Sequence, residues 1–204
     1  MVTARERAVR LAGQAAGQVR DPEMPMLTLA DLGVLRGVDV DPRPDGDVVI
    51  AHITPTYTGC PAMATMRDDL VHRLNDAGFP HVEVRVVLDP PWSSDWISER
   101  GRAALREAGL SPPGPVSSGG TTPHTPRQEQ PGRLPPLRRS SAPGTGPASG
   151  RPVGLVLGPV RLAPRCPRCG SASTRLTSEF GATACKALYT CTGCLEPFEH
   201  VKEI

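Results

Sequence analysis

The chain has 204 residues, enough for one or two small domains, and a formal net charge of +2. Residues 1–110 carry 12 basic and 16 acidic side chains, residues 111–163 carry 6 and 1, and residues 164–204 carry 5 and 4. Neither end has the one-sided basic field that a phosphate backbone requires, so the charges argue against nucleic acid as a partner. The first residues mix both signs of charge without a long apolar run, which predicts no signal peptide, no membrane association and a cytoplasmic protein with reduced cysteines.

The first elements follow from hydrophobic periodicity. Residues 4–19 have apolar side chains at helical spacing and end before Asp21-Pro22, where proline disfavours a further helical turn. Residues 33–41 alternate apolar and polar side chains, and residues 47–54 are rich in β-branched types. Asp45-Gly46 between them is a turn signal, so we expect a β-hairpin.

The second half of this region continues the pattern. Met63, Met66, Leu70 and Leu74 lie on one helical stripe that ends at Gly78. Residues 81–88 alternate as a half-buried strand, and a last helix is expected to be capped by residues 93–95 and to end at Gly109. The order αββαβα predicts a small two-layer α/β domain over residues 1–110, of the α+β class for the chain as a whole.

Cys60 precedes Pro61, a residue that fits the first position of a helix. This spacing makes Cys60 the expected helix cap, where unpaired backbone N–H groups and the helix dipole would lower its pKa. Such a thiol is either a reactive sulfur or metal ligand, or a small apolar side chain under the sheet.

Residues 111–163 contain half of the 24 prolines and no aromatic residue. Such a composition cannot bury enough apolar surface to offset the entropy lost on ordering, so we expect a disordered linker between residue 110 and residue 164. The alternative is a proline-rich recognition segment at Leu134-Pro-Pro-Leu-Arg-Arg139.

Residues 164–204 contain two Cys-x2-Cys pairs, Cys166 with Cys169 and Cys191 with Cys194, which are separated by 21 residues. Each pair directs two sulfurs at a common point from a tight turn, and a hairpin between them would bring four thiolates around one tetrahedral ion. Zinc suits four sulfurs best, although iron or a cluster would accept the same ligands. Two disulfides are the alternative, which a chain without an export signal disfavours.

Residues 173–179 and 186–190 are expected to form the strands of this zinc ribbon, with Cys185 close to the site. Cys185 is either an exchangeable ligand or handoff thiol, or a buried small side chain. Trp92 and Trp96 could form a lid beside Cys60 or fill the core. The histidines at positions 52, 72 and 81 have no partners at ligand spacing, and no catalytic triad, phosphate loop or dinucleotide fingerprint is present.

Three motifs resemble a known family. Asp21-Pro-Glu-Met-Pro25, Leu29-Ala-Asp-Leu-Gly33 and the segment 54–61, Thr-Pro-Thr-Tyr-Thr-Gly-Cys-Pro, are similar to the metal-sulfur cluster biosynthesis domains. Together with the segment 180–187, Phe-Gly-Ala-Thr-Ala-Cys-Lys-Ala, and the two cysteine pairs, they resemble the D (or J) subunit family of the bacterial phenylacetyl-CoA epoxidase. The resemblance covers both ends of the chain and omits the linker.

The resemblance implies an accessory role in aerobic phenylacetate breakdown, without independent catalysis. The partners would be the di-iron oxygenase subunits or the reductase with flavin and a 2Fe-2S cluster, one of whose iron sites this chain would mature. Cys60 would hold iron or a cluster, Asp21 and Glu23 would lie near it, and the four paired cysteines would hold a structural metal. A purely structural subunit, a redox component and a nucleic-acid-binding ribbon are the competing hypotheses.

Overall fold

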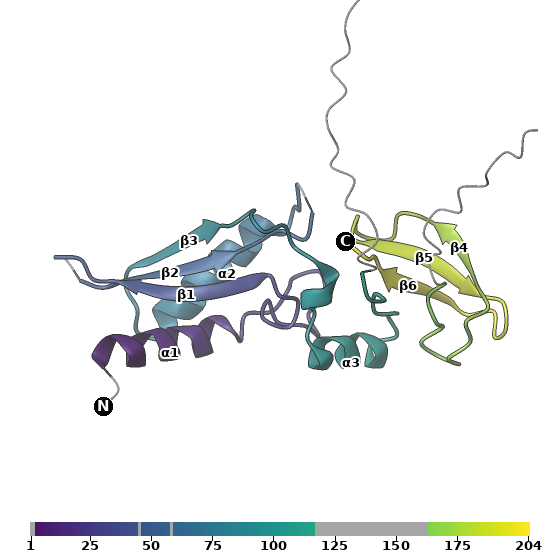
Figure 1. The fold of residues 1–204 in the computed structure, drawn as a ribbon, viewed down its shortest axis with the longest axis horizontal. Helices are drawn as coiled ribbons and strands as arrows, with labels where there is room; N and C mark the ends of the chain where they lie inside the picture. The colour runs from purple at the N-terminus through teal and green to yellow at the C-terminus, as the bar shows by residue number, and fades with distance from the viewer. Residues whose placement is uncertain (1–2, 45, 58, 117–162) are drawn as a thin grey trace, which may run out of the picture. The chain divides into compact units, whose positions relative to one another are not determined.

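The computed structural model describes residues 3–44, 46–57, 59–116 and 163–204 (Figure 1). The helices and strands of these residues are α1 (Ala4–Ala16), β1 (Leu35–Asp41), β2 (Val48–Ile53), α2 (Met63–Asp76), β3 (Val82–Val86), the 3-10 helix η1 (Ser94–Trp96), α3 (Glu99–Glu107), β4 (Thr174–Ser178), β5 (Lys186–Cys191) and β6 (Pro197–Val201). Positions 117–162, which make up most of the predicted linker and contain the proline-rich segment at Leu134, lie outside the described residues. The predicted domain boundaries therefore remain a prediction.

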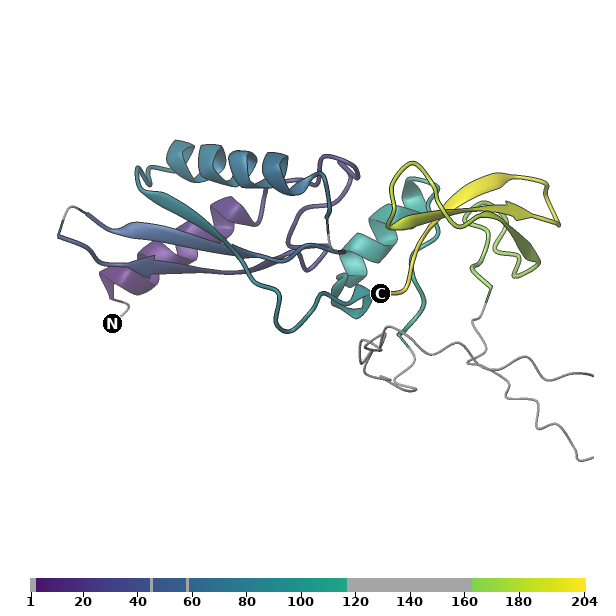
Figure 2. The ribbon, with the colours of Figure 1, turned by 90° about the horizontal axis from the view of Figure 1, so that it is seen from above.

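The N-terminal region is a three-stranded sheet in the order β1-β2-β3. β1 and β2 form the predicted antiparallel hairpin, and β2 pairs in parallel with β3 after the α2 crossover. α1 contacts β1, α2 contacts β3, and the two helices contact each other, so both cover the same face of the sheet (Figures 1 and 2). The predicted order and the two-layer α+β class are confirmed.

The core between the helices and the sheet is formed by residues that hydrophobic periodicity predicted to be buried. Met66, Leu70 and Leu74 of α2 are buried, as are Val49 and Ile53 of the central strand. They belong to one apolar cluster with the buried small residues of α1. Amphipathic spacing at a period of 3.6 on the helices and of 2 on the strands therefore determines this part of the fold.

The start of the last helix differs from the prediction. Ser93 caps the short η1, whereas α3 begins at Glu99 behind a second cap, Ser98, whose hydroxyl accepts a hydrogen bond from the Gly101 N–H. The Ser98 hydroxyl also donates to Asp31, so the cap of α3 is tied to the motif 29–33.

Asp31 joins this helix start to the motif 29–33. Its side chain is buried and accepts hydrogen bonds from Thr28 N at 3.0 Å and from the Ser98 hydroxyl at 2.9 Å, and it pairs with Arg100. Trp92 is also buried, and its indole N–H donates to the Leu32 carbonyl at 2.8 Å. Trp92 therefore fills the core, which was one of the two predicted alternatives, the other being a lid beside Cys60.

The C-terminal region is a second antiparallel sheet in the order β4-β5-β6. β4 and β5 match the two predicted strands, but β6 was not predicted. Tyr189 stacks on Phe198 with ring centroids 5.9 Å apart, so two cross-strand aromatic rings cover the small core of this ribbon.

β6 and the chain end also contact the residues around α3. Ser111 N donates to the Glu199 carbonyl at 2.9 Å, and Val201 N donates to the Ser111 carbonyl at 3.0 Å. Val201 is buried and belongs to the same apolar cluster as α2. Ser94 N donates to the Ile204 carbonyl at 3.0 Å. The ribbon is thus anchored by backbone hydrogen bonds at the end of β6.

The carboxylate of Glu203 is part of this anchor, because it contacts both Gly114 and His200. Partial burial favours a raised pKa for Glu203, but hydrogen bonds from the His200 ring and the Gly114 N–H outweigh it and hold its pKa at about 2, below the usual 4.5. Its contribution is therefore complete above pH 4.5 and is lost as the pH falls towards 2. We expect Glu203→Gln to lower the free energy of unfolding by about 1.5 to 3 kcal/mol at pH 7, the range of a hydrogen bond to a charged group.

Urea unfolding of both proteins at pH 7 and pH 3 checks this expectation. The difference between wild type and Glu203→Gln should shrink at pH 3. An equal or larger difference at pH 3 would contradict the role of the carboxylate.

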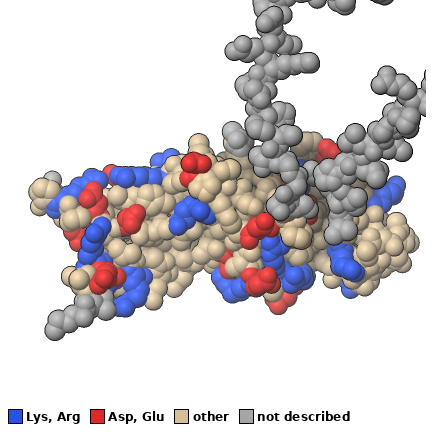
Figure 3. All heavy atoms as spheres, viewed as in Figure 1, with Lys and Arg blue, Asp and Glu red and all other residues tan. Residues whose placement is uncertain are grey.

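Charged side chains of both signs are interspersed on the face shown in Figure 3, without an extended patch of one sign among the described residues of that face. Within the described ranges, the helices are all too short or too polar to cross a membrane.

Candidate functional site

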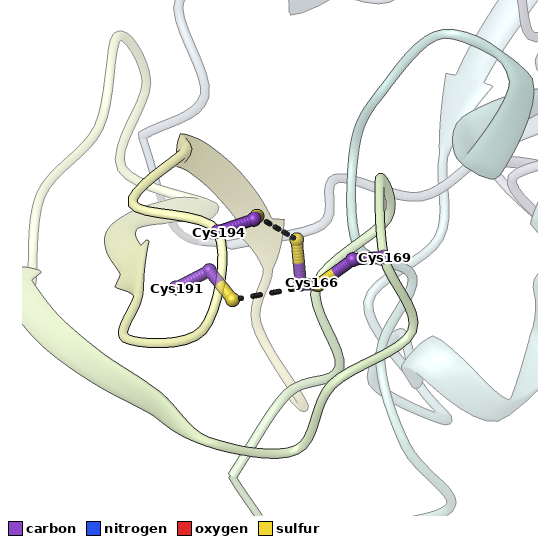
Figure 4. A group of neighbouring side chains, drawn as sticks. All are labelled: Cys166, Cys169, Cys191 and Cys194. Carbon is purple, nitrogen blue, oxygen red and sulfur yellow. Dashed lines mark hydrogen bonds between the residues drawn. The ribbon is translucent and has the colours of Figure 1, made fainter.

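Four sulfurs meet at the end of the ribbon. The Sγ atoms of Cys166, Cys169, Cys191 and Cys194 all lie within 4.8 Å of one another. Cys166 Sγ is 3.7 Å from Cys194 Sγ, and Cys169 Sγ is 3.6 Å from Cys191 Sγ (Figure 4). All four are free thiols, so the spacing prediction of one four-sulfur site is met and the disulfide alternative is not.

The same backbone turn presents each pair of sulfurs. Gly170 follows the first pair, adopts φ +73°, and donates its N–H to the Cys166 carbonyl at 2.9 Å. Leu195 follows the second pair, adopts φ +64°, and donates its N–H to the Cys191 carbonyl at 3.0 Å. Leucine rarely adopts a positive φ, so the second turn keeps a strained residue in order to repeat the first.

These distances fit a metal ion. Sulfurs bound at about 2.3 Å in a tetrahedron lie about 3.8 Å apart, close to the two sulfur–sulfur distances observed. The backbone N–H groups of Cys194 and Gly193 point at the Cys191 sulfur and lower its pKa to about 6, although burial opposes this shift. Thiolates are the ligands that a metal requires, so this shift favours the binding form of Cys191, whereas burial and the neighbouring sulfurs raise the pKa of Cys194 to about 12.

Cys60 lies elsewhere, in the N-terminal region. It follows a turn in which its N–H donates to the Tyr57 carbonyl at 3.3 Å, and its side chain is half-buried against the main apolar cluster. Two expectations about it were wrong. α2 begins at Met63 behind Ala62, so Cys60 is not the cap.

Its pKa is also raised and not lowered. Burial is the largest cause, and the charges of Glu23, Asp21 and Cys185 add to it, while the Ala62 N–H works in the other direction. Cys60 is thus a protonated thiol at neutral pH, which suits a ligand that loses its proton to an arriving metal better than a free nucleophile.

Asp21 and Glu23, which the resemblance placed near Cys60, lie in one turn, and their charges raise the pKa of Cys60. Asp21 is buried, and its Oδ1 accepts hydrogen bonds from Glu23 N at 2.9 Å and Met24 N at 2.7 Å. Burial raises the pKa of both carboxyl groups, and the charge of Asp21 raises that of Glu23 further. That these two carboxyl groups are ligands together with Cys60 stays a prediction.

Cys185, in the ribbon, is the other cysteine outside the four-sulfur site whose charge acts on Cys60. It is buried, and its Sγ lies 3.0 Å from the Thr183 hydroxyl. Burial raises its pKa, and the charge of Glu23 adds to the increase. Its neighbour Lys186 is also buried and pairs with Glu199 at 2.8 Å.

Sequence reasoning did not select Lys186, although its charge acts on both Asp21 and Glu23. A lysine that begins a strand is ordinarily exposed, and only its position directly after Cys185 in a motif could have drawn attention to it. Among the described residues, His52, His72, His81 and Trp96 are not part of either sulfur site.

Comparisons with known proteins agree with this division. The iron-sulfur cluster assembly protein family matches residues 14–88, and the PaaD zinc beta ribbon domain matches residues 154–202. The chain is 37% identical over 185 residues to an Escherichia coli (strain K12) protein named as the D subunit of 1,2-phenylacetyl-CoA epoxidase, and the match covers 91% of this chain and 87% of the relative.

Two further similarities each cover about half of the chain. The chain is 38% identical over 96 residues to the Fe-S protein maturation auxiliary factor YitW of Bacillus subtilis (strain 168), covering 45% of this chain and 86% of that protein. The crystal structure of a DUF59 domain from Bacillus anthracis is 27% identical, with a TM-score of 0.45, over 50% of this chain and 94% of that one.

Fold and sites together define a protein with an iron-sulfur assembly domain and a four-cysteine, metal-binding zinc ribbon. Identity over nearly the whole length then fixes the particular family. The chain belongs to the D-subunit family of the phenylacetyl-CoA epoxidases.

Proposed function

We propose that the chain is an accessory subunit of a phenylacetyl-CoA epoxidase system and that it supplies or repairs the iron centre of a partner subunit. Iron, as an ion or a cluster, would be cargo held at Cys60 with Asp21 and Glu23 beside it. The names of the two relatives support both halves of this proposal, because one is an epoxidase subunit and the other is an Fe-S maturation factor.

The four ribbon cysteines would hold zinc permanently. Four sulfurs at tetrahedral spacing are the donor set that structural zinc prefers, and the matching family is a zinc ribbon. Zinc has no redox chemistry, so at this position it would supply stability to a ribbon whose own apolar core consists of a few residues.

The observation that carries the proposal is the separation of the two sulfur sites. Cys60 is half-buried, and burial and the charges of Glu23 and Asp21 raise its pKa, but it is not among the four cysteines whose sulfurs converge. A site with few sulfurs and nearby oxygens binds iron less tightly than a closed four-sulfur site, which is what a carrier that must release its cargo needs.

The partners proposed are the di-iron oxygenase subunits and the reductase with flavin and a 2Fe-2S cluster. Either would be a client into which the cargo passes. A cytoplasmic location, where both would be made, belongs to the same proposal.

The experiment is co-expression of each client with wild-type chain or with Cys60→Ser, followed by iron analysis of the purified client. We expect the variant to keep its zinc and its melting temperature while client iron falls at least fivefold. Glu107→Gln, an exposed acidic side chain on α3, is the control and should leave client iron unchanged. Full client iron with Cys60→Ser would reject the proposal.

A structural subunit is the second candidate. Large apolar side chains are exposed on the ribbon, with Phe180 at 67% and Leu195 at 76% of their full exposure, and such residues suit a protein interface. This candidate predicts co-purification with the oxygenase in a fixed ratio that Cys60→Ser does not alter, together with normal client iron.

A further inference from the structure

The strand β3 forms one edge of the N-terminal sheet (Figure 1). It pairs with β2 on one side, and within the described part of the chain no strand pairs with its other side. An edge of this kind presents a row of backbone N–H and C=O groups to an approaching strand. The features of the edge then decide which strand it accepts.

The backbone groups of every second residue of β3 point outward. The His81 carbonyl accepts a hydrogen bond from β2 at 2.9 Å, and the Val87 N–H donates one to β2 at 2.8 Å. In a parallel pair, residues that bond to the neighbouring strand alternate with residues that face the other way. The odd-numbered residues therefore face β2, and the even-numbered residues direct their N–H and C=O groups outward. These are Val82, Val84 and Val86.

The side chains of this edge are apolar on one face and charged on the other. Val82 and Val84 pack against the main apolar cluster, whereas Val86 is 43% exposed. Glu83 and Arg85 lie on the opposite face, because side chains alternate along a strand. They pair with each other, with Arg85 Nη2 2.6 Å from Glu83 Oε2. Like charges along an edge would repel a second strand of the same kind, but this edge carries one charge of each sign.

A groove of about 490 Å³ lies between α2 and this strand. Val71 of α2 and Val82 and Val84 of β3 provide its apolar lining, and Arg67 and Asp68 add one charge of each sign. A strand that pairs with β3 therefore needs apolar side chains on the face towards the helices. It also needs charges of both signs on the other face, and β3 itself meets both requirements.

We infer that the partner is a second copy of this chain, and that two β3 strands pair antiparallel about a two-fold axis at Val84. This register places Val82 opposite Val86, and it places Glu83 opposite Arg85 of the other copy on each side of the axis. All three outward-facing residues then form hydrogen-bonded pairs. A parallel pairing in register would place Glu83 opposite Glu83, and like charges opposite each other are unfavourable.

The pairing would continue the sheet from one copy into the other. A two-fold axis perpendicular to the sheet keeps both α2 helices on the same face, so the exposed Val86 of each copy lies towards the groove of the other. The inference is independent of the proposed function, because the residues of this edge include none of the six cysteines.

The test is sedimentation equilibrium of the full, zinc-loaded chain over a wide range of protein concentration. We expect a reversible dimer. Arg85→Glu makes the edge wholly acidic and Glu83→Arg makes it wholly basic, so each variant alone places like charges opposite each other twice. Each should have a dimer dissociation constant raised by about tenfold or more. An equimolar mixture of the two variants should form a heterodimer, because the acidic edge is complementary to the basic edge.

Arg106→Glu and Glu107→Arg are the matched controls. Both side chains are exposed on α3, and the substitutions change the net charge by the same amounts. The control variants should dimerise as wild type does.

Several outcomes would overturn the inference. A wild-type chain that stays monomeric at every concentration has no such interface. A dimer that Arg85→Glu leaves unchanged uses another surface. If both variants dissociate but their mixture does not associate, the antiparallel register is wrong. If wild type is monomeric and Arg85→Glu abolishes its co-purification with an oxygenase subunit, the edge accepts a strand of that protein and not of a second copy.

Discussion

Replacing Cys191 by serine is expected to remove the ribbon metal and to unfold residues 163–204. Cys191 is fully buried at the end of β5, and its sulfur lies 3.6 Å from Cys169 Sγ. Structural zinc contributes about 10 kcal/mol or more to small metal-binding folds, which exceeds what the few apolar residues of this ribbon could replace. Zinc analysis and hydrogen exchange of β5 and β6 measure the effect.

The N-terminal region provides an internal reference in this experiment. Amides of α2 should keep their protection in Cys191→Ser, because their core is built from α1, α2 and the first sheet. Glu179→Gln in the same ribbon should keep both zinc and protection. Protected β5 amides in a zinc-free Cys191→Ser protein would show that the metal does not hold the ribbon together.

Alanine at position 33 is expected to have the largest effect outside the ribbon. Gly33 adopts φ +69°, and an added Cβ would lie 2.6 Å from Trp96 Cβ and 3.0 Å from its carbonyl oxygen. Both the backbone conformation and the close packing oppose the substitution, and together they should cost about 3 kcal/mol. The free energy of unfolding from urea titration is the measurement.

Gly13→Ala is the matched control for this substitution. Gly13 lies inside α1, and an added Cβ there would meet no atom within 4 Å. Alanine favours helix over glycine by about 0.8 to 1 kcal/mol, so this variant should be more stable than wild type. Equal effects at positions 13 and 33 would contradict the account of the turn at Gly33.

Local pattern predicted most of the fold. The stripe Met66, Leu70 and Leu74 identified α2, and alternation identified β1 and β3, because burial on one face imposes a fixed period on the sequence. Local pattern did not predict β6, because Pro197–Val201 is short and starts with a proline. Its strand conformation depends on pairing with β5 and with Ser111, which sequence spacing does not reveal.

The two sulfur sites also differ in how far local sequence determines them. Cys-x2-Cys spacing carries its own geometry, so the four-sulfur cluster could be predicted in full. The environment of Cys60 could not, because its raised pKa comes from burial and from charges on Asp21, Glu23 and Cys185, which the fold assembles from both ends of the chain. The expectation of a lowered pKa at a helix cap considered only the residues nearest to Cys60, and the pKa is raised instead.

We propose that one sulfur site keeps its metal and that the other carries iron. Zinc and iron contents of the anaerobically purified chain, measured for wild type, Cys60→Ser and Cys191→Ser, test it most directly. We expect Cys60→Ser to lose iron and to keep one zinc per chain, whereas Cys191→Ser should lose zinc. Iron that persists in Cys60→Ser and disappears with Cys191→Ser would contradict it, because all metal would then belong to the ribbon.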